Sequence, residues 1–308
     1  MEFGIFGSLQ DDQVRILKKR LEDKNCKVTV IDFKEFPSKV RIYFNEEKII
    51  FEGKNLFDMN GFYVRQLGYF WPVPHIKLTK EQWMKYYERY NDLLLNEREN
   101  LSFKHSMIRI LNYEKLVVNP YDSFMYHRMK PYQYYLFHKH NLPIPPFFAG
   151  DAHHITEKCN VANMVYKPLA GGAEVIMAND FLKKNKEIIE KRAVLFQEYI
   201  KGENIRVFLA EDEFIGAGKI LQGPQVDSRA EQYGVEVVDL PEDIKEIAFK
   251  ALEIVGMKFS GVDFMLSKDG EYYLLECNPS PMFYVFEQWS GIKVSEKLAE
   301  YLIRHGKQ

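Results

Sequence analysis

The segment from Phe259 to Pro281 reads FSGVDFMLSKDGEYYLLECNPSP. Two runs of β-forming residues, 262–266 and 272–277, flank the dipeptide Asp269-Gly270. An Asp-Gly pair between two such runs favours a β-hairpin, because a type I′ turn needs positive φ at both central residues. The segment is therefore predicted to form two antiparallel strands joined by a tight turn.

The turn sets the register of this hairpin. If the Asp-Gly pair is the whole loop, Lys268 faces Glu271, and Asp263 then lies directly opposite Glu276. Asn278 points to the same face as Glu276, because side chains alternate along a strand. Two carboxylates and one amide oxygen are therefore expected on one surface of the strand pair.

These three side chains suit a magnesium ion. Like charges directly opposite each other destabilise a ladder, so a cation is expected beside Asp263 and Glu276. Mg²⁺ takes one or two carboxylates and completes its shell with water and phosphate. Asp263, Glu276 and Asn278 are thus a candidate metal site, and the alternative is a solvated polar face on an ordinary hairpin.

Length and composition bound the remaining possibilities. The chain has 308 residues, enough for two domains or three small ones. Charged residues make up 28% and the formal net charge is −2, which argues against nucleic acid or an anionic membrane as partner. The three scattered cysteines lack metal-ligand spacing, and no apolar run approaches the ~18 residues of a membrane span. We therefore expect a cytoplasmic protein with no nucleic-acid or membrane partner.

The first part of the chain predicts an α/β domain. Strands at 3–7 and 27–33 enclose apolar residues at helical spacing, which indicates a βαβ unit with parallel strands. A hairpin is expected over 40–51, and a strand over 61–66 contains Arg65 near its end. Arg65 either binds a substrate anion or forms a surface ion pair.

Two helices are predicted next, over 79–96 and 100–111, the first with Thr79 as its N-cap. A short strand at 116–118 follows and is stopped by Asn119-Pro120, where we place the first domain boundary.

Two lysines are candidate phosphate ligands. A helix is predicted over 129–140 with Lys130 at its start, where a cation opposes the helix dipole. A strand over 163–168 places Lys167 beside the Gly171-Gly172 turn. Such a turn lets backbone N–H groups approach an anion closely, although a Gly-Gly pair also makes an ordinary hairpin turn.

The chain before and after the hairpin described above predicts a domain of mixed strands and helices. The strand expected at 203–209 carries Arg206, the strand expected at 214–220 ends near Lys219, and the polar, irregular stretch after it contains Arg229. In chain order the predicted elements are strands at 194–200, 203–209 and 214–220, the irregular stretch 222–233, and helices at 240–255 and 290–305.

Together these segments resemble the ATP-grasp fold, most closely the branch of the ribosomal-protein-S6 glutamate ligase. The likeness covers about residues 120–308. The whole chain also looks like the ATP-grasp ligases that form ester and amide crosslinks in ribosomal peptides. Those ligases usually have Asn-Pro-x-Gly-Gln where this chain has Asn-Pro-Ser-Pro-Met at 278–282. The matching segments are Lys130, Lys167-Pro-Leu, Gln197-Glu198-Tyr-Ile, Ile205-Arg206-Val, Arg229, Asp263 and Glu276-Cys-Asn278.

The resemblance implies an architecture. It predicts an α/β fold, α+β in the ATP-grasp part, in which a βαβ domain at 1–120 precedes two β-rich subdomains that clasp ATP. The central lid subdomain spans 121–195, and the C-terminal subdomain with the metal site spans 196–308.

The resemblance also implies how ATP binds. The backbone carbonyl of Glu198 would accept the adenine amino proton, and the backbone N–H of Ile200 would donate to the ring. Lys130 and Lys167 would bind the α- and β-phosphates. Asn204 stands where the family has a ribose-binding acid, and Glu203 is the alternative. The complete implied nucleotide-binding set is Lys130, Lys167, Gly171, Gly172, Gln197, Glu198, Tyr199, Ile200, Glu203 and Asn204.

The implied reaction is ATP-dependent ligation. A carboxylate would be phosphorylated to an acyl phosphate, and an amine or hydroxyl would then displace phosphate. Two Mg²⁺ ions, or Mn²⁺, would bind Asp263, Glu276 and Asn278. Arg206 and Arg229, with Lys219 as a further helper, would stabilise the transferring phosphoryl group, and a surface ion pair is the alternative for each arginine.

Other outcomes stay open at this stage. A phosphotransferase that stops before ligation, or a nucleotide-binding regulatory protein without turnover, would share these motifs. The carboxylate could belong to a small molecule or a peptide, and a homo-oligomer is compatible with the sequence. Arg65, the segment 69–71 and the stretch 222–233 are candidates for the acceptor wall.

Overall fold

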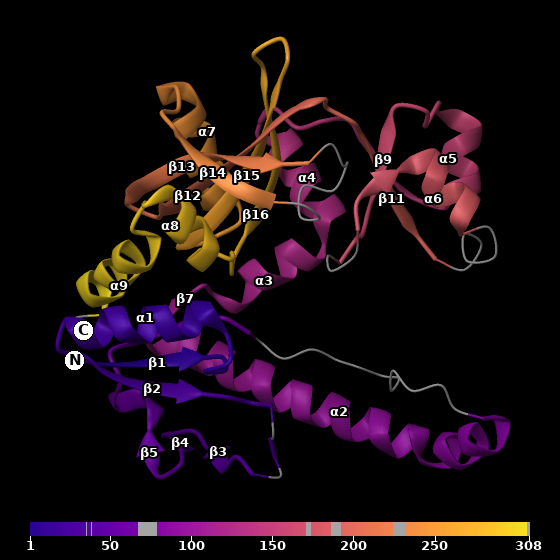
Figure 1. Ribbon diagram of the computed structural model, residues 1–308. Helices are drawn as coiled ribbons and strands as arrows, with labels where there is room; N and C mark the ends of the chain where they lie inside the picture. The colour runs from indigo at the N-terminus through magenta and orange to yellow at the C-terminus, as the bar shows by residue number, and fades with distance from the viewer. Residues whose placement is uncertain are drawn as a thin grey trace. The chain divides into compact units, whose positions relative to one another are not determined.

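The computed structural model describes residues 1–34, 36–37, 39–66, 79–170, 174–185, 192–223 and 232–306 (Figure 1). The chain divides into two units. The first unit is Met1–Tyr121 together with Ala299–Gln308, and the second is Asp122–Leu298.

The first unit is built on a parallel sheet. Strands β1 (Glu2–Phe6), β2 (Lys27–Ile31), β6 (Gly61–Val64) and β7 (Leu116–Val118) pair in the order β2-β1-β6-β7, every pair parallel. The side chains of β1, β6 and β7 are mostly buried, as expected of a parallel sheet covered on both faces, whereas those of the edge strand β2 are mostly half-buried. The predicted βαβ opening is confirmed.

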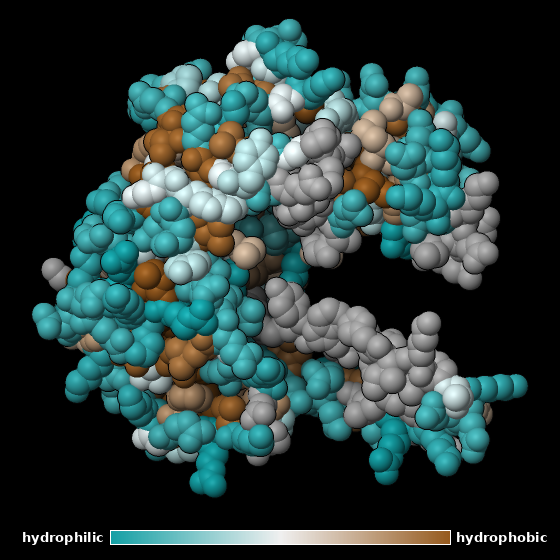
Figure 2. Space-filling model, viewed as in Figure 1, coloured by the Kyte–Doolittle hydropathy of each residue, from teal (hydrophilic) through white to brown (hydrophobic). Residues whose placement is uncertain are grey.

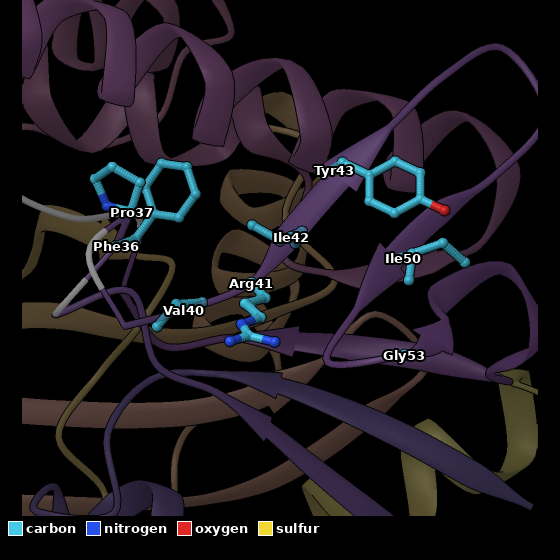
Figure 3. Close-up of a pocket in the computed structure, with 8 residues that line it drawn as sticks. All are labelled: Phe36, Pro37, Val40, Arg41, Ile42, Tyr43, Ile50 and Gly53. Atoms are coloured by element: carbon cyan, nitrogen blue, oxygen red, sulfur yellow. The ribbon is translucent and has the colours of Figure 1, made fainter.

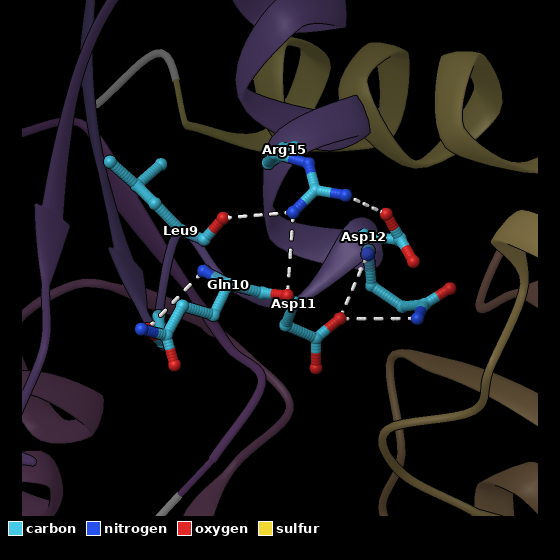
Figure 4. Close-up of polar contacts among 7 residues, drawn as sticks. Leu9, Gln10, Asp11, Asp12 and Arg15 are labelled. Carbon is cyan, nitrogen blue, oxygen red and sulfur yellow. Dashed lines mark hydrogen bonds and ion pairs between the residues drawn. The ribbon is translucent and has the colours of Figure 1, made fainter.

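The βαβ helix α1 (Asp12–Asp23) is capped by Asp11, whose carboxylate accepts a hydrogen bond from the backbone N–H of Gln13 at 2.8 Å (Figure 4). The second carboxylate oxygen of Asp11 lies 2.7 Å from Nε of Arg65, and both side chains are largely buried. Arg65 therefore forms an ion pair with the cap of α1, which was the alternative to a substrate-binding role.

A small antiparallel sheet follows, formed by β3 (Ile42–Phe44), β4 (Ile49–Phe51) and β5 (Lys54–Asn55), with the short 3₁₀ helix η1 (Leu56–Asp58) after it. The hairpin predicted over 40–51 is confirmed. A cavity of about 560 Å³ opens on this sheet, lined chiefly by apolar side chains such as Val40 and Ile50 (Figure 3).

Helix α2 runs without a break from Lys80 to Glu114. The prediction of two helices was wrong, because the junction Asn96-Glu-Arg-Glu-Asn100 contains no Gly or Pro and its charged residues are good helix formers. The predicted N-cap is confirmed: Thr79 and Gln82 form a capping box.

The second unit begins with two helices, α3 (Tyr121–Arg128) and α4 (Lys130–Lys139), and then forms an antiparallel sheet of order β10-β9-β11-β8. Helices α5 (Ala152–Lys158) and α6 (Ala178–Lys184) pack on one face of this sheet, where Tyr166, Phe181 and Phe196 form a small core. The four strands are β8 (Phe147–Gly150), β9 (Met164–Lys167), β10 (Ile176–Met177) and β11 (Val194–Glu198). This part, 147–198, contains most of the lid subdomain predicted over 121–195, and we use the name lid subdomain for it from here on.

A five-stranded antiparallel sheet completes the second unit, in the order β14-β13-β12-β15-β16. Helices α4 and α7 (Glu242–Ile254) bury one face, and α8 (Tyr284–Ser290) lies on the other through Phe286 and Phe208. The strands are β12 (Gly202–Ala210), β13 (Glu213–Gln222), β14 (Gln232–Val238), β15 (Phe259–Ser267) and β16 (Tyr272–Asn278).

The stretch 222–233 was expected to be irregular, but its two ends belong to strands, because β13 reaches Gln222 and β14 begins at Gln232. The part between them, 224–231, lies outside the described residues. The helix expected over 290–305 is confirmed as α9 (Val294–His305), which begins later than predicted because Ser290 is the last residue of α8 and Gly291, with φ of 75°, ends that helix.

The visible surface is predominantly hydrophilic, with hydrophobic side chains showing through in small patches (Figure 2). Within the described residues, no helix combines the length and the apolar character that crossing a membrane requires.

Candidate functional site

The hairpin β15–β16 places Asp263 directly opposite Glu276, as predicted. The route to that register differs from the prediction. Ser267 donates its N–H to the carbonyl of Glu271 at 2.8 Å, so Lys268 does not face Glu271. The loop is Lys268-Asp269-Gly270, a turn in which only Gly270 has positive φ, at 87°.

A β-bulge corrects the offset that this longer loop introduces. The register shifts between Asp263 and Phe264, which leaves Leu275 as the extra residue of β16. Because of the bulge, Leu274 and Cys277 both point into the core, while Glu276 lies on the opposite face with Asp263. A regular strand would place Leu274 and Glu276 on the same face.

Each of the two carboxylates is paired with a cationic side chain of the chain itself. Arg206 on β12 is the ladder partner of Asp263 and binds it through two bonds, Nε–Oδ1 at 2.6 Å and Nη2–Oδ2 at 2.8 Å. Glu276 forms an ion pair with Lys130. The repulsion expected between directly opposite carboxylates is thus offset by two protein charges.

Lys130 reaches Glu276 from the start of α4. The residue is 6% exposed, and its helix has no side-chain cap at Met129. A buried lysine at a helix N-terminus opposes the helix dipole, so its placement is explained by the acidic partner and not by helix stability. The fold therefore brings together Lys130, Arg206, Asp263 and Glu276, which are far apart in sequence.

The third predicted metal ligand, Asn278, lies on the same strand. Its side-chain Oδ1 accepts the N–H of Ser280 at 3.0 Å, and its backbone carbonyl accepts the hydroxyl of Ser260 at 3.0 Å. These bonds fix the side chain, and a carbonyl oxygen with one acceptor bond retains a second lone pair for a cation.

Lys167 and Gln197 lie on the lid face opposite the small lid core. Lys167 is the ladder partner of Leu195, and Gln197 is the partner of Val165, whereas Tyr166 and Phe196 point into the core. The Gly171-Gly172 turn lies outside the described residues.

The backbone after β11 is held by two bonds. Glu198 donates its N–H to Pro146 O at 2.8 Å, and Tyr199 donates to Asn163 O at 2.8 Å. The predicted adenine-binding segment, Glu198 to Ile200, is thereby anchored to two neighbouring segments.

Two of the predicted nucleotide-binding side chains have unsatisfied buried atoms. Within the described residues, Nε2 of Gln197 and Oδ1 of Asn204 have no hydrogen-bond partner, and both residues are buried. The Gln197 amide lies near the hydroxyl of Tyr134 without reaching hydrogen-bond geometry. Burial raises the pKa of Tyr134, so the hydroxyl stays protonated. A buried donor and acceptor without partners fit a polar ligand such as a nucleoside.

Lys219 is not brought to the face that carries Asp263. Arg206 pairs with Gly218, so the next residue, Lys219, points to the opposite face. There Lys219 lies 2.5 Å from Glu203 and 3.7 Å from Glu236, and the hydrogen bond to Glu203 raises its pKa. Arg229 and residues 69–71 lie outside the described residues, as does most of 222–233.

One residue that was not predicted as a site residue, Gln133, contacts strand β16. The side-chain amide of Gln133 on α4 bonds both the N–H and the carbonyl of Cys277, at 3.0 and 3.3 Å. Its spacing of three residues from Lys130 places it on the same side of the helix, which is the signal that could have indicated it.

Comparison with known families agrees with this geometry. The model of the RimK-like ATP-grasp domain matches residues 148–302. A tetrahydromethanopterin:alpha-L-glutamate ligase from Methanocaldococcus jannaschii is 28% identical over an alignment of 255 residues, and the match covers 73% of this chain and 84% of that protein. A probable alpha-L-glutamate ligase from Shewanella amazonensis is 32% identical over an alignment of 171 residues, and the match covers 50% of this chain and 56% of that protein.

Solved structures show the same fold over nearly the whole chain. The ATP-grasp ligase PsnB complexed with a minimal precursor has a TM-score of 0.82 at 24% identity, covering 98% of each chain. The macrocyclase MdnC bound with precursor peptide MdnA, from Microcystis aeruginosa, has a TM-score of 0.76 at 18% identity, covering 99% of this chain and 100% of that one. The predicted α/β fold is confirmed, and the chain belongs to the RimK-like ATP-grasp family of ligases.

Proposed function

We propose that the chain phosphorylates a substrate carboxylate with ATP and joins the resulting acyl phosphate to an amine. A carboxylate is a poor electrophile because its negative charge repels nucleophiles. Transfer of the γ-phosphoryl group forms a carboxyl O–P bond and breaks the bond to ADP. The amine then attacks the carbonyl carbon, loses a proton, and displaces phosphate.

The observation that carries this proposal is the charge cluster on one face of the five-stranded sheet. Asp263, Glu276 and Asn278 supply hard oxygen donors, and Lys130 and Arg206 lie against the two carboxylates. Oxygen donors of this kind fit Mg²⁺, which neutralises phosphate charge when bound. We infer two ions at this face, with Mn²⁺ as a substitute.

The two ion pairs suggest an exchange of partners when substrates bind. In the structure, Lys130 and Arg206 each hold a carboxylate. We propose that both cations turn to phosphate oxygens when nucleotide and Mg²⁺ enter, Lys130 to the nucleotide and Arg206 to the transferring group. The carboxylates are then released for the metal. Neither step leaves a buried charge without a partner, which would otherwise be costly.

The nucleotide-binding roles of the lid are part of the same proposal. Lys167 would bind phosphate beside the Gly171-Gly172 turn, and the unsatisfied atoms of Gln197 and Asn204 would bind the nucleoside. We propose that the lid subdomain closes over ATP and excludes water, which would hydrolyse an acyl phosphate. Arg229 stays a proposed ligand of the transferring phosphoryl group.

The relatives suggest which amine is used. The curated relatives with 28% to 33% identity are named alpha-L-glutamate ligases, so we propose the α-amine of glutamate as the first candidate acceptor. A peptide substrate is the second candidate, because two structures that match nearly the whole chain, those of PsnB and MdnC, are complexed with a minimal precursor and with a precursor peptide.

The test measures ADP release with a panel of carboxylates, with and without glutamate or an acidic, lysine-containing peptide. A ligase releases ADP with a carboxylate present and forms an amide whose mass increases by that of the acceptor minus water. Hydroxylamine should trap the acyl phosphate as a hydroxamate. A stable phosphorylated product with no effect of any amine would identify a kinase instead, and nucleotide binding without turnover would identify a regulatory protein.

A further inference from the structure

Strand β16, which carries the proposed metal ligands Glu276 and Asn278, lies at the edge of its sheet. Backbone groups of alternate residues there point away from β15. At Cys277 both the N–H and the carbonyl point outward. An edge strand normally bonds these groups to water or to another strand. Here the side chain of Gln133 bonds both of them, at 3.0 Å from the N–H and 3.3 Å from the carbonyl.

The amide of Gln133 therefore takes the place of a peptide group from a sixth strand. The residue is fully buried, so water does not compete for these bonds. Further along the edge, the N–H of Leu274 bonds the carbonyl of Pro143 at 2.7 Å. Both ends of the bulge are thus held from outside the sheet.

Cys277 stands between the two metal-ligating candidates of β16. Its peptide orientation fixes the direction in which the neighbouring side chains Glu276 and Asn278 leave the strand. The bulge at Leu275 interrupts the ladder with β15 next to Glu276. Backbone bonds from β15 are therefore incomplete at the residue whose orientation the metal site depends on.

We propose that Gln133 is a positioning residue of the metal site: by bonding both backbone groups of Cys277, it aims Glu276 and Asn278 at the ion. This inference rests on the proposed function. Residues that orient metal ligands without touching the metal typically change affinity by 10- to 100-fold when replaced. Because Gln133 and Lys130 share one helix, α4 sets both the metal ligands and their cationic partner.

The experiment compares Gln133→Met with Phe137→Leu. Methionine keeps the length and volume of the buried side chain but forms neither bond. Phe137 is buried one turn further along α4, so its substitution loosens the same helix while the Gln133–Cys277 bonds remain. Mn²⁺ binding in the presence of ADP is measured by electron paramagnetic resonance, and thermal unfolding is measured without metal.

The expected result is that Gln133→Met weakens Mn²⁺ binding by about tenfold or more, whereas Phe137→Leu lowers the unfolding temperature and leaves Mn²⁺ affinity unchanged. Amide hydrogen exchange at Cys277 should also be faster in Gln133→Met alone. If both variants bind Mn²⁺ as wild type does, Gln133 has only a structural role and the inference fails.

A third variant, Glu276→Gln, separates this inference from the proposed function. Loss of Mn²⁺ binding in Glu276→Gln with wild-type binding in Gln133→Met overturns the positioning role alone. Unchanged Mn²⁺ binding in Glu276→Gln overturns the metal assignment itself.

Discussion

The two sheets of the second unit are held together differently. The five-stranded sheet packs on α4 and α7 through a large core, and its charged face contains two largely buried ion pairs. The lid sheet has a smaller core of its own around Tyr166, Phe181 and Phe196. A metal site needs ligands fixed in direction, while a phosphate lid must open and close. Local opening follows local core size, so the lid should open at the lower free energy.

The largest effect on activity is expected at the charged face of the five-stranded sheet. Glu276→Gln removes the charge of a proposed metal ligand while keeping the shape of the side chain. We expect ADP formation to fall by about a thousandfold, about 4 kcal/mol in the barrier, with the fold unchanged by circular dichroism. Turnover near that of wild type would show that the metal does not bind this carboxylate.

Arg206→Met should destabilise the charged face, because Asp263 loses its cationic partner. Asp263 would lose both bonds from the guanidinium and stay buried, at a cost of about 3 kcal/mol in the free energy of unfolding. Urea unfolding measures the loss, and Mg²⁺ with nucleotide should recover part of it. Equal destabilisation with and without Mg²⁺ and nucleotide would contradict the proposed exchange of partners.

At the lid, Lys167→Ala should weaken ATP binding by about tenfold, the contribution of one charge-assisted contact. Lys184→Ala is the matched control, because that lysine is exposed on α6 of the same subdomain. Isothermal titration calorimetry gives both dissociation constants. Equal constants would remove Lys167 from the phosphate site.

The smallest effect is on lid motion. An ATP analogue with Mg²⁺ should slow amide exchange in β9 and β11 severalfold, and by more than in β1 of the first unit. Hydrogen exchange is suited to this, since lid opening is slower than the motions that B-factors record. Protection confined to β15 and β16 would mean that the lid does not close on phosphate.

The sequence predicted the charged face because hairpin signals are local. Asp269-Gly270 indicated the turn, and alternation then placed Asp263 across from Glu276. The prediction succeeded through two errors that cancel: the loop is longer than expected, and Leu275 bulges. No local pattern announces a bulge, since it is stabilised by contacts from Gln133 and Pro143 in another part of the chain.

The ion pairs between residues far apart in the chain could not be predicted from the sequence for the same reason. Lys130 and Arg206 were predicted as phosphate ligands, but their pairing with Glu276 and Asp263 depends on how α4 and β12 pack on the hairpin. Lys219 shows the opposite limit. Its strand was predicted, but the face it points to follows from its pairing with β12, which only the fold reveals.

The bulge at Leu275 divides the hairpin into two independent segments. Between the loop and the bulge the two strands pair in one register, and beyond the bulge, from Asp263 and Glu276 onward, they pair in another. Loop tips tolerate insertion well. In this hairpin the bulge lies between the loop and the pair Asp263 and Glu276. A fluorescent label or an affinity tag can therefore be inserted at the tip, Lys268-Asp269. We expect such an insertion to leave the pairing of Asp263 with Glu276 unchanged.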